Sequence, residues 1–225
     1  PIEFYDCDED CIVDSDEDGV CDELEILGCT DVEACNYNFD ATEENGSCEY
    51  ADEGGNCQYE IGGYANGGII FYLDETGQHG LVAAVNDVEG RREWGCWGVN
   101  VNGTSQEFGM GLQNTLNIIA TDCQVEFPGN ETVNAAQAAY NHESGGYSDW
   151  YLPSVDELRE LVKEIGPNSA LGNLANLDLI YWYWTSSQSG ENTAYAYDIT
   201  FGSSGMAEWM GWKDYFQNVR PIRSF

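Results

Sequence analysis

Residues 149–167 read DWYLPSVDELRELVKEIGP, and this stretch predicts a helix with both ends marked. Ser154 is a candidate N-cap, and Glu157, three residues later, completes a capping box. Gly166 and Pro167 end the helix. Between these limits apolar side chains recur at helical spacing, at Leu158, Leu161, Val162 and Ile165. The pattern predicts a helix with one face on a packed core.

Strand patterns lie on both sides of this helix. GIIFYL at residues 68–73 and LVAAV at 81–85 predict two strands joined by a turn at 74–77. The carboxyl-terminal part predicts four more strands, at residues 181–186, 194–201, 205–210 and 218–223. Strands at both ends with helices between them predict an α+β domain whose two ends meet in one sheet.

Two further helices are predicted between these groups of strands. Residues 112–120 place Leu112, Leu116 and Ile119 on one apolar face. The alanine-rich residues 133–140 predict the other helix.

The amino-terminal part has a different composition, and residues 14–25 read DSDEDGVCDELE. This matches a twelve-residue calcium loop, with carboxylates at positions 1, 3, 5, 9 and 12, the turn glycine at position 6 and a backbone carbonyl at position 7. Calcium is therefore the expected cofactor, and the alternative is a solvated acidic linker. An earlier acidic set would share or flank a second ion. The candidate ligands are Asp14, Asp16, Asp18, Val20, Asp22 and Glu25, and in the earlier set Asp6, Asp8 and Asp10.

The charge balance excludes several classes of partner. The chain has 41 acidic and 7 basic residues, a net charge of -34. It has no supply of cations for binding a phosphate backbone, so we expect no nucleic-acid partner. An anionic membrane surface would repel it, and no run of about 18 apolar residues exists for membrane insertion. The expected partners are neutral, cationic or bridged by calcium.

Seven of the nine cysteines lie in the first 57 residues. A short, acidic segment of this kind cannot fold on a hydrophobic core, and disulfides and metal must therefore hold it. Disulfides indicate an extracellular or cell-surface location. A zinc site is the competing interpretation, but paired Cys-x-x-Cys knuckles are absent. Cys96 and Cys123 are the two remaining cysteines, and a disulfide between them is the economical assignment. Because the chain opens on Pro1, we interpret it as part of a longer protein.

Two short segments resemble known extracellular modules. Residues 1–27 resemble the calcium-binding type 3 repeats of thrombospondins, although the loop spacing also fits an EF-hand or dockerin. Residues 28–50, GCTDVEACNYNFDATEENGSCEY, resemble a cysteine-rich module of secreted surface proteins from marine Bacteroidetes. Within this module a second cation and a disulfide-stapled, asparagine-rich turn are both open interpretations. The residues concerned are Asn36, Asn38, Asp40 and Glu44.

The larger part of the chain carries a further resemblance. GGIIFYLDETGQHGLVAA, EWGCWG, DWYLPSVDELREL, YWTSS and NVRPIRSF follow one another along it. Together they are similar to the C-terminal domain family of the Legionella collagen-like adhesin, over residues 62–225. The resemblance implies a C-type-lectin-like fold used for adhesion to glycans or surface proteins. The chain is thus divided into a calcium-binding segment (1–27), a cysteine-rich module (28–58) and an adhesion domain (59–225).

In this fold the loops between the late strands usually carry the ligand, and MAEWMGWKDYF at 206–216 lies in that position. Aromatic rings there would stack on sugar rings, and neighbouring polar groups would bond hydroxyls. The candidates are Trp209, Trp212 and Tyr215 for stacking, with Asn192, Glu208, Lys213 and Asp214 as polar groups. The Glu-Pro-Asn and Trp-Asn-Asp triplets of calcium-dependent lectins are absent, which argues against sugar binding through calcium. We expect Trp150 and Trp182 in the core, and Arg220 and Arg223 paired with carboxylates.

Nothing in the sequence indicates catalysis. The two histidines, His79 and His142, do not lie in a triad-like setting, and nucleophile, zinc-protease and phosphate-loop motifs are absent. Paired carboxylates for glycoside cleavage remain a minor alternative. We expect a non-enzymatic module in which a calcium-stiffened stalk presents an adhesive head. The alternative is a structural subunit of an extracellular fibre, in which the head packs on neighbouring copies.

Overall fold

The computed structural model describes residues 13, 15, 20–126, 132–198 and 207–225, and side chains within them except at 195–198 and 207–209. The chain divides into two compact units, residues 1–58 and 59–225. Six of the proposed calcium ligands lie outside the described residues: Asp6, Asp8, Asp10, Asp14, Asp16 and Asp18.

The smaller unit is held by disulfides around a minimal sheet. Strands β1 (Leu27–Gly28) and β2 (Glu43–Glu44) pair in parallel. Cys29 bonds Cys48 and Cys35 bonds Cys57, with Cα atoms 4.8 and 5.6 Å apart. Apolar side chains such as Val32 and Phe39 are 73% and 58% exposed, so covalent links replace a hydrophobic core here.

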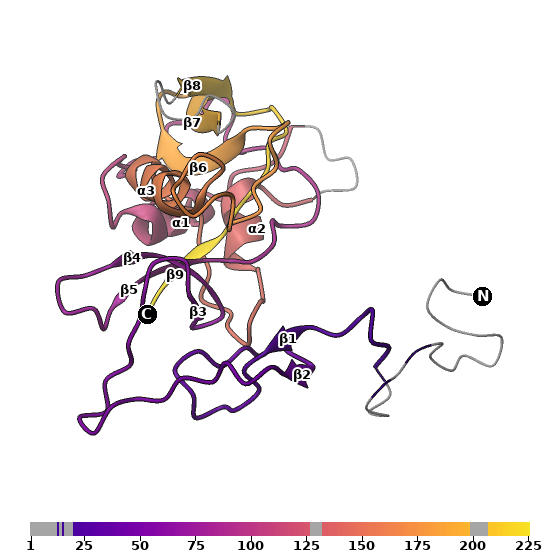
Figure 1. Ribbon diagram of the computed structural model, residues 1–225. Coiled ribbons are helices and arrows are strands. Elements are labelled where there is room, and N and C mark those ends of the chain that lie inside the picture. The colour runs from indigo at the N-terminus through magenta and orange to yellow at the C-terminus, as the bar shows by residue number, and fades with distance from the viewer. Residues whose placement is uncertain (1–12, 14, 16–19, 127–131, 199–206) are drawn as a thin grey trace. The chain divides into compact units, whose positions relative to one another are not determined.

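In the larger unit, the first sheet joins the two ends of the domain. Its order is β3 (Tyr64–Ala65), β4 (Gly68–Leu73), β5 (Gly80–Ala83) and β9 (Ile222–Ser224), all antiparallel. The carboxyl-terminal strand β9 thus pairs with β5, as Figure 1 shows near the C label. The expectation that both ends of the domain share a sheet is met.

A second antiparallel sheet lies at the other end of this unit. It consists of β6 (Tyr183–Gln188), β7 (Thr193–Asp198) and β8 (Ala207–Trp212) in sequence order. Three helices lie between the two sheets in Figure 1. They are α1 (Gly111–Ala120), α2 (Ala135–Tyr140) and α3 (Val155–Ile165).

Helix α3 begins and ends as the sequence predicts. The Ser154 hydroxyl accepts a hydrogen bond from the Glu157 N–H, and the Glu157 carboxylate accepts one from the Ser154 N–H at 2.7 Å. Leu158, Leu161 and Ile165 are buried in a core that also contains Phe71 of β4 and Tyr183 of β6. The helix therefore contributes its apolar stripe to a core shared by both sheets.

The predicted apolar face of α1 is wrong. Leu112 and Leu116 are 41% and 38% exposed, whereas Asn114 and Thr115 are fully buried. The Asn114 amide donates to the Ser105 carbonyl at 2.7 Å and to the Ser186 hydroxyl at 3.1 Å. The Thr115 hydroxyl accepts from the Leu152 N–H at 3.1 Å. The face of α1 that carries Asn114 and Thr115 is buried because its polar groups find hydrogen-bond partners in the core, and the face with Leu112 and Leu116 is left exposed.

Three fully buried tryptophans, Trp94, Trp150 and Trp184, form much of the remaining core. The core position expected for Trp150 is correct, and Trp182 is partly buried against the cluster that contains Trp94 and Trp184. The indole N–H groups of Trp94 and Trp184 donate to the backbone carbonyls of Thr185 and Arg92, both at 2.8 Å. These bonds give each buried indole N–H the hydrogen-bond partner that it would otherwise lack.

Two buried arginines pair with carboxylates as expected. Arg220 donates to Asp87 at 2.7 Å, and Arg223 donates to both oxygens of Asp149 at 2.6 and 3.0 Å. Tyr183 donates to the second oxygen of Asp87 at 2.7 Å.

Among the described residues, no helix has the length and apolar character needed to cross a membrane.

Candidate ligand-binding surface

An exposed group of aromatic rings lies at the end of β8. The Tyr215 N–H donates to the Trp212 carbonyl at 2.9 Å, which closes a turn and brings these two residues together. Trp212 is 44% exposed and Tyr215 is 45% exposed. The Trp97 ring lies 5.4 Å from the Trp212 ring, tilted by 41°. We call Trp97, Trp212 and Tyr215 the aromatic surface.

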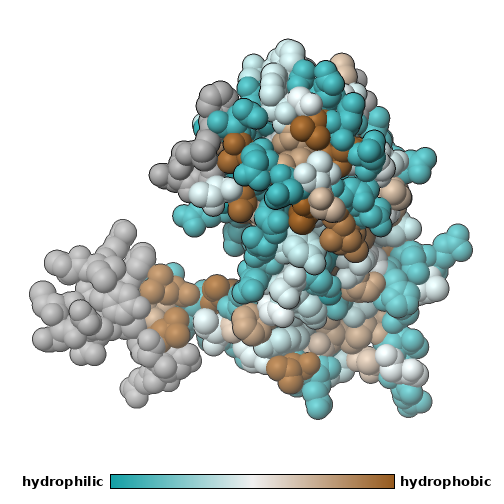
Figure 2. Space-filling model, turned by 180° about the vertical axis from the view of Figure 1, so that it is seen from behind, coloured by the Kyte–Doolittle hydropathy of each residue, from teal (hydrophilic) through white to brown (hydrophobic). Residues whose placement is uncertain are grey.

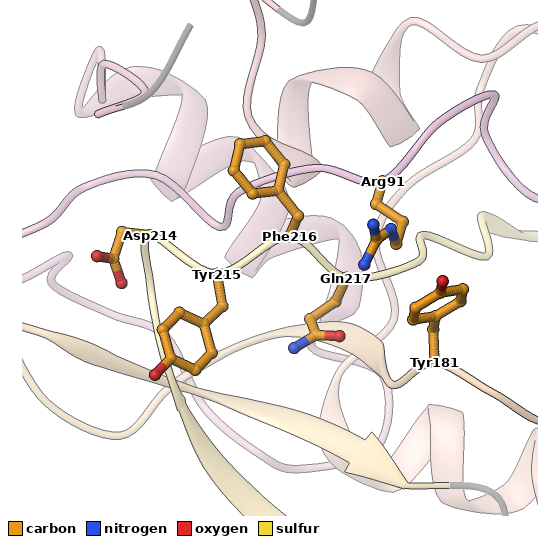
Figure 3. A pocket seen from close by; sticks show the side chains of 6 residues that line it. All are labelled: Arg91, Tyr181, Asp214, Tyr215, Phe216 and Gln217. Atoms are coloured by element: carbon orange, nitrogen blue, oxygen red, sulfur yellow. The ribbon is translucent and has the colours of Figure 1, made fainter. Parts of the chain in front are cut away.

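The same turn borders an open pocket of about 560 Å³, shown in Figure 3. The guanidinium of Arg91 lies 4.2 Å from the centroid of the Tyr181 ring. In Figure 3 these two side chains face each other at one end, and Asp214 lies at the other end with its carboxylate directed away from them. We call this the Arg91 pocket, lined by Arg91, Tyr181, Asp214, Tyr215, Phe216 and Gln217.

Backbone pairing fixes the floor of the pocket. Arg92 and Gln217 exchange two hydrogen bonds, at 2.9 and 3.0 Å. On the other side, the Asn218 N–H donates to the Trp182 carbonyl at 2.9 Å, and the Trp184 N–H donates to the Asn218 carbonyl at 3.0 Å. The residues that precede β9 therefore lie between two extended segments, and these carry Arg91 and Tyr181. Backbone hydrogen bonds thus hold the segments that carry the pocket residues.

Lys213 does not face a ligand, contrary to the sequence-based expectation. Its side chain is fully buried. The ammonium donates to the carbonyls of Val99 at 2.8 Å and Cys96 at 3.3 Å, and to the Gln188 side-chain oxygen at 2.8 Å. It also lies 4.6 Å from the centroid of the Trp94 ring. Burial lowers the pKa of the Lys213 ammonium to about 8. Lys213 therefore acts as an internal cation beneath the aromatic surface.

Asn192 holds the same loop from its other side. Its side-chain oxygen accepts a hydrogen bond from the Gly98 N–H at 2.9 Å, and its carbonyl accepts one from the Lys213 N–H at 3.1 Å. The side-chain oxygen is therefore engaged within the protein, and the role of Asn192 in bonding a ligand hydroxyl stays a prediction. Asn192 positions the loop that carries Trp97.

A disulfide closes the base of this loop. Cys96 and Cys123 are bonded, with Cα atoms 4.6 Å apart. Cys96 has a φ of 60°, a left-handed conformation that non-glycine residues rarely adopt. Its carbonyl is one of the three acceptors of Lys213. The covalent bond and the buried ammonium together hold a backbone that would otherwise relax.

The other ligand candidates divide into two groups. Asp214 lines the Arg91 pocket, and its Oδ1 atom is buried without a hydrogen-bond partner. Glu208 and Trp209 belong to β8, where they pair with Tyr197 and Ala196, and their side chains lie outside the described part of the structure. The structure thus brings Trp212, Asp214 and Tyr215 together on one accessible segment.

The pocket arginine and Trp97 were not predicted as site residues. Arg91 lies in a short polar stretch, and its only sequence signal is that it is one of seven basic residues in a highly acidic chain. Trp97 lies directly after Cys96, more than 100 residues from Trp212. Only the fold brings these side chains to the turn at residues 212–215.

In the acidic segment, the described part of the predicted calcium loop shows one local contact. Asp22 accepts hydrogen bonds from the Ser15 N–H at 2.7 Å and from the Ser15 hydroxyl at 2.6 Å. These bonds lower the pKa of the Asp22 carboxyl. The Asp22 N–H donates to the Val13 carbonyl at 3.0 Å, which closes the loop on itself. Val20 and Glu25, the other described candidates, flank this contact in the sequence.

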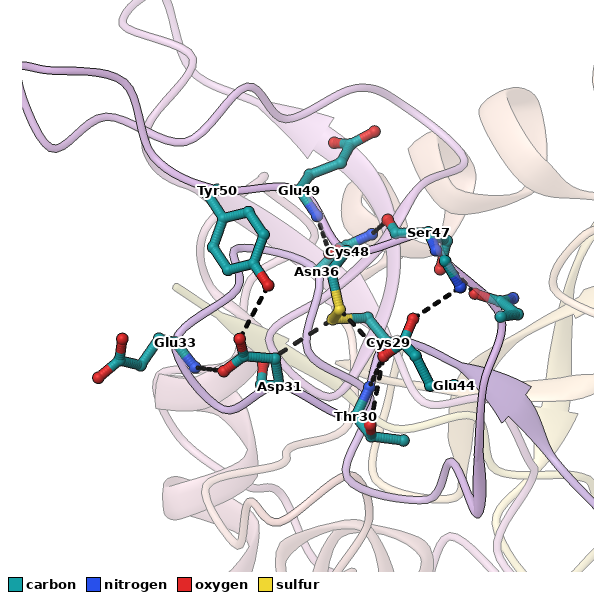
Figure 4. Close-up of a disulfide and its surroundings, with 12 residues drawn as sticks. Cys29, Thr30, Asp31, Glu33, Asn36, Glu44, Ser47, Cys48, Glu49 and Tyr50 are labelled. Carbon is teal, nitrogen blue, oxygen red and sulfur yellow. Dashed lines mark hydrogen bonds between the residues drawn. A yellow bond between two sulfur atoms is a disulfide. The ribbon is translucent and has the colours of Figure 1, made fainter. Parts of the chain in front are cut away.

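Hydrogen bonds in the cysteine-rich module form the asparagine-rich turn, and the second cation stays a prediction. Asn36 accepts from the Glu49 N–H at 2.8 Å, and Glu44 accepts from the Thr30 N–H at 2.9 Å, as Figure 4 shows. Asn38 accepts from the Asp40 N–H at 3.1 Å. Glu44 lies beside Cys29 and Cys48, but these cysteines form a disulfide and provide no thiolate for a metal.

Comparison with known proteins identifies the larger unit. A solved structure described as a fimbrial protein from Bacteroides ovatus ATCC 8483 is similar at 16% identity, with a TM-score of 0.48. The match covers 85% of this chain and 48% of that chain, so the chain spans about half the length of that protein. None of the curated proteins matches. The family model described as the Lcl C-terminal domain matches residues 96–223, more than half of the sequence and nearly all of the candidate surface. The chain therefore belongs to the Lcl C-terminal domain family.

Proposed function

We propose that the protein is an extracellular adhesion module whose larger unit binds glycan through the aromatic surface. Membership of the Lcl C-terminal domain family and the disulfides favour an extracellular adhesion or fibre-subunit role. The observation that supports glycan binding is the turn that presents Trp212 and Tyr215, each nearly half exposed. Aromatic rings of this kind pack on the apolar face of a sugar ring.

The rigidity of the surface strengthens this proposal. Trp97 follows a disulfide-bonded cysteine, and Trp212 precedes a lysine whose ammonium donates to three oxygen atoms in the core. Rings held in this way lose little conformational entropy when a ligand binds, so more of the contact energy appears as affinity. We further propose a C-type-lectin-like fold for this unit, with ligand binding and no catalysis as its role.

For the smaller unit we propose a mechanical role. Residues 14–25 would bind calcium, which offsets the repulsion among their carboxylates and stiffens the segment as a stalk. Extracellular calcium sites bind with dissociation constants of about 10⁻⁴–10⁻³ M, which suits a millimolar calcium environment.

A glycan array tests the adhesive role. We expect the wild-type chain to bind a defined group of glycans, and Trp212→Ala to lose this signal with an unchanged melting temperature. Tyr140→Ala is the matched control, since Tyr140 is 42% exposed on α2, outside the aromatic surface and the Arg91 pocket. Equal binding by wild type and Trp212→Ala, or an array without any signal, would contradict the proposal.

The alternative is a subunit of an extracellular fibre. Leu179 and Ile180 favour it, because they are 51% and 78% exposed on one segment of the larger unit. On the side shown in Figure 2, however, apolar side chains lie in small groups among hydrophilic ones, which opposes a broad apolar interface on that side. Size-exclusion chromatography with light scattering separates the two roles. A monomer with glycan signals supports adhesion, and concentration-dependent assembly without them supports the fibre.

A further inference from the structure

Arg91 differs from the other six basic residues. Arg159, Lys163, Arg220 and Arg223 form ion pairs with carboxylates. Arg92 and Lys213 are buried. Arg91 is exposed and belongs to no ion pair within the described part of the chain. In a chain of net charge -34, an exposed guanidinium without a carboxylate partner is unexpected from charge alone.

The surroundings of Arg91 orient its guanidinium and leave its donors available. The group lies over the Tyr181 ring at 4.2 Å, and it makes no side-chain hydrogen bond to any described residue. Asp214, the one carboxylate that lines the pocket, points away from it in Figure 3. Stacking on an aromatic face uses the plane of the guanidinium, so its N–H edge remains free to bind an acceptor.

The chemistry of this edge suits a carboxylate. A guanidinium presents two parallel N–H donors that match the two oxygens of a carboxylate, and such charge-assisted pairs are about twice as strong as neutral hydrogen bonds. The larger unit carries 21 acidic and 7 basic residues, so its overall field repels anions. A long polyanion would meet that repulsion along its length. A single carboxylate would contact Arg91 directly. Its attraction to Arg91 would then exceed its repulsion by the more distant acidic residues, because salt screens charges beyond about 8 Å.

The rest of the pocket fits a sugar ring attached to that carboxylate. A volume of about 560 Å³ is in the range of small-molecule sites. Tyr215 lies on the side of Gln217 away from Arg91 in Figure 3, and its ring offers a stacking face. The Gln217 amide, between Tyr215 and the Arg91 end, offers both a donor and an acceptor for hydroxyl groups. Resting on the proposed glycan binding, we infer that the Arg91 pocket binds an acidic sugar residue, with its carboxylate on Arg91.

Titration calorimetry with paired monosaccharides tests this inference. The probes are methyl β-glucuronide and methyl β-glucoside, which differ only in a carboxylate against a hydroxymethyl group. We expect the full chain to bind the glucuronide at least about tenfold more tightly. Arg91→Gln should lower the affinity for the glucuronide to that for the glucoside, which removes the preference. Arg91→Lys retains a charge without the two-pronged geometry, and restores only part of the preference.

Arg159→Gln is the matched control, because Arg159 lies on α3, outside the pocket. It should retain the full preference, and the melting temperatures of all variants should agree. Equal affinity of wild type for the two sugars would overturn the inference, as would an unchanged preference in Arg91→Gln. N-acetylglycine, a carboxylate without a sugar ring, is a third probe. Binding of N-acetylglycine as tight as that of the glucuronide would assign the pocket to a chain-terminal carboxylate instead.

The array described above separates this inference from the proposed function. Neutral glycans bound through Trp212, without an Arg91-dependent preference for the glucuronide, would leave adhesion standing and remove the acidic-sugar assignment. An array without any signal, together with no heat from either monosaccharide, would remove both.

Discussion

The ammonium of Lys213 lies 2.8 Å from the side-chain oxygen of Gln188, beneath the exposed ring of Trp212. The same Gln188 oxygen accepts a hydrogen bond from the Val101 N–H, also at 2.8 Å. One lysine and one glutamine thus join β6, the end of β8 and the loop that follows Cys96. The sequence indicates Lys213 as a ligand-binding residue, but in the structure its side chain holds the segments that carry the aromatic surface.

Lys213→Met should destabilise the larger unit by about 2–4 kcal/mol, because it leaves buried oxygen acceptors without their charged donor. Urea unfolding followed by tryptophan fluorescence measures the change. Lys163→Met is the control, since Lys163 is exposed and pairs with Glu160 and Glu164 on the helix surface, where such pairs contribute about 0.5 kcal/mol. Similar unfolding midpoints for the two variants would show that the buried ammonium is not a structural cation.

The pH dependence of unfolding should carry the signature of Lys213. Its pKa is about 8 in the folded protein and about 10.4 in an unfolded chain. Between about pH 8 and pH 10.4 the unfolded state binds more protons than the folded state. The contribution of Lys213 to the free energy of unfolding therefore rises with pH in this range, and it is lost as the pH falls through 8. The difference in unfolding free energy between wild type and Lys213→Met should therefore grow from pH 8 to pH 10. A difference that stays flat or shrinks would refute the lowered pKa.

Loss of the disulfide between Cys96 and Cys123 should have an effect of similar size. The two cysteines are 27 residues apart. Release of a loop of that length raises the entropy of the unfolded chain, which lowers the free energy of unfolding by about 3.5 kcal/mol at 25 °C. The double variant Cys96→Ser, Cys123→Ser should unfold at correspondingly lower urea. It should also lose glycan binding earlier on heating than wild type does, because Trp97 adjoins the bond. A loss of under about 1 kcal/mol would mean that Lys213 alone holds this loop.

Local rules predict the elements of this fold well where each residue has one structural role. Ser154 and Glu157 form the capping box, and residues 68–73 form the strand that their apolar run indicates. Helix α1 breaks the rule, because Asn114 and Thr115 take the buried face through bonds to Ser105 and Leu152. Periodicity counts apolar side chains and takes no account of acceptors that lie far away in the sequence.

The candidate site was predictable only in part for the same reason. Trp212 and Tyr215 are apparent because aromatic residues in a glycine-bearing segment between strands are unusual. Arg91 and Tyr181 meet only because Gln217 and Asn218 bond the backbone of their neighbours Arg92 and Trp182. Lys213 looks like a surface residue in the sequence, and its burial depends on Cys96, Val99 and Gln188, which lie at 25 to 117 residues' distance. Long-range pairing of this kind leaves no local signal.

Glu157 supplies a second test of pH dependence, with the opposite sign. Burial raises the pKa of this carboxyl above its ordinary value. The folded state then binds the proton more tightly, so the contribution of Glu157 to stability is complete below about pH 4.3 and is lost as pH rises through the raised pKa. The unfolding free energy of wild type minus that of Glu157→Gln should decrease from pH 4 to pH 7. An increase would mean that the hydrogen bond from the Ser154 N–H outweighs burial and lowers the pKa.

Calcium removal tests the stalk. The carboxylates at loop positions 1, 3, 5, 9 and 12 repel one another unless a cation lies among them, so calcium should bind there and stabilise the smaller unit. Calorimetry on the full chain at neutral pH should show binding that Asp16→Asn with Asp18→Asn abolishes. Asp52→Asn is the control, because Asp52 accepts from the Gly54 and Asn56 N–H groups in a turn outside the loop. Asp22 adds a separate prediction, since its two oxygens are already bonded to Ser15. Ser15→Ala removes the hydroxyl that donates to Oδ2 and keeps the backbone N–H that donates to Oδ1. Calcium affinity should therefore rise if the Asp22 Oδ2 atom is a ligand, and stay constant if the role of Asp22 is to close the loop. Identical heats for wild type and the Asp16, Asp18 double variant would make the segment a solvated acidic linker, and the adhesive head would then be tethered by a flexible chain.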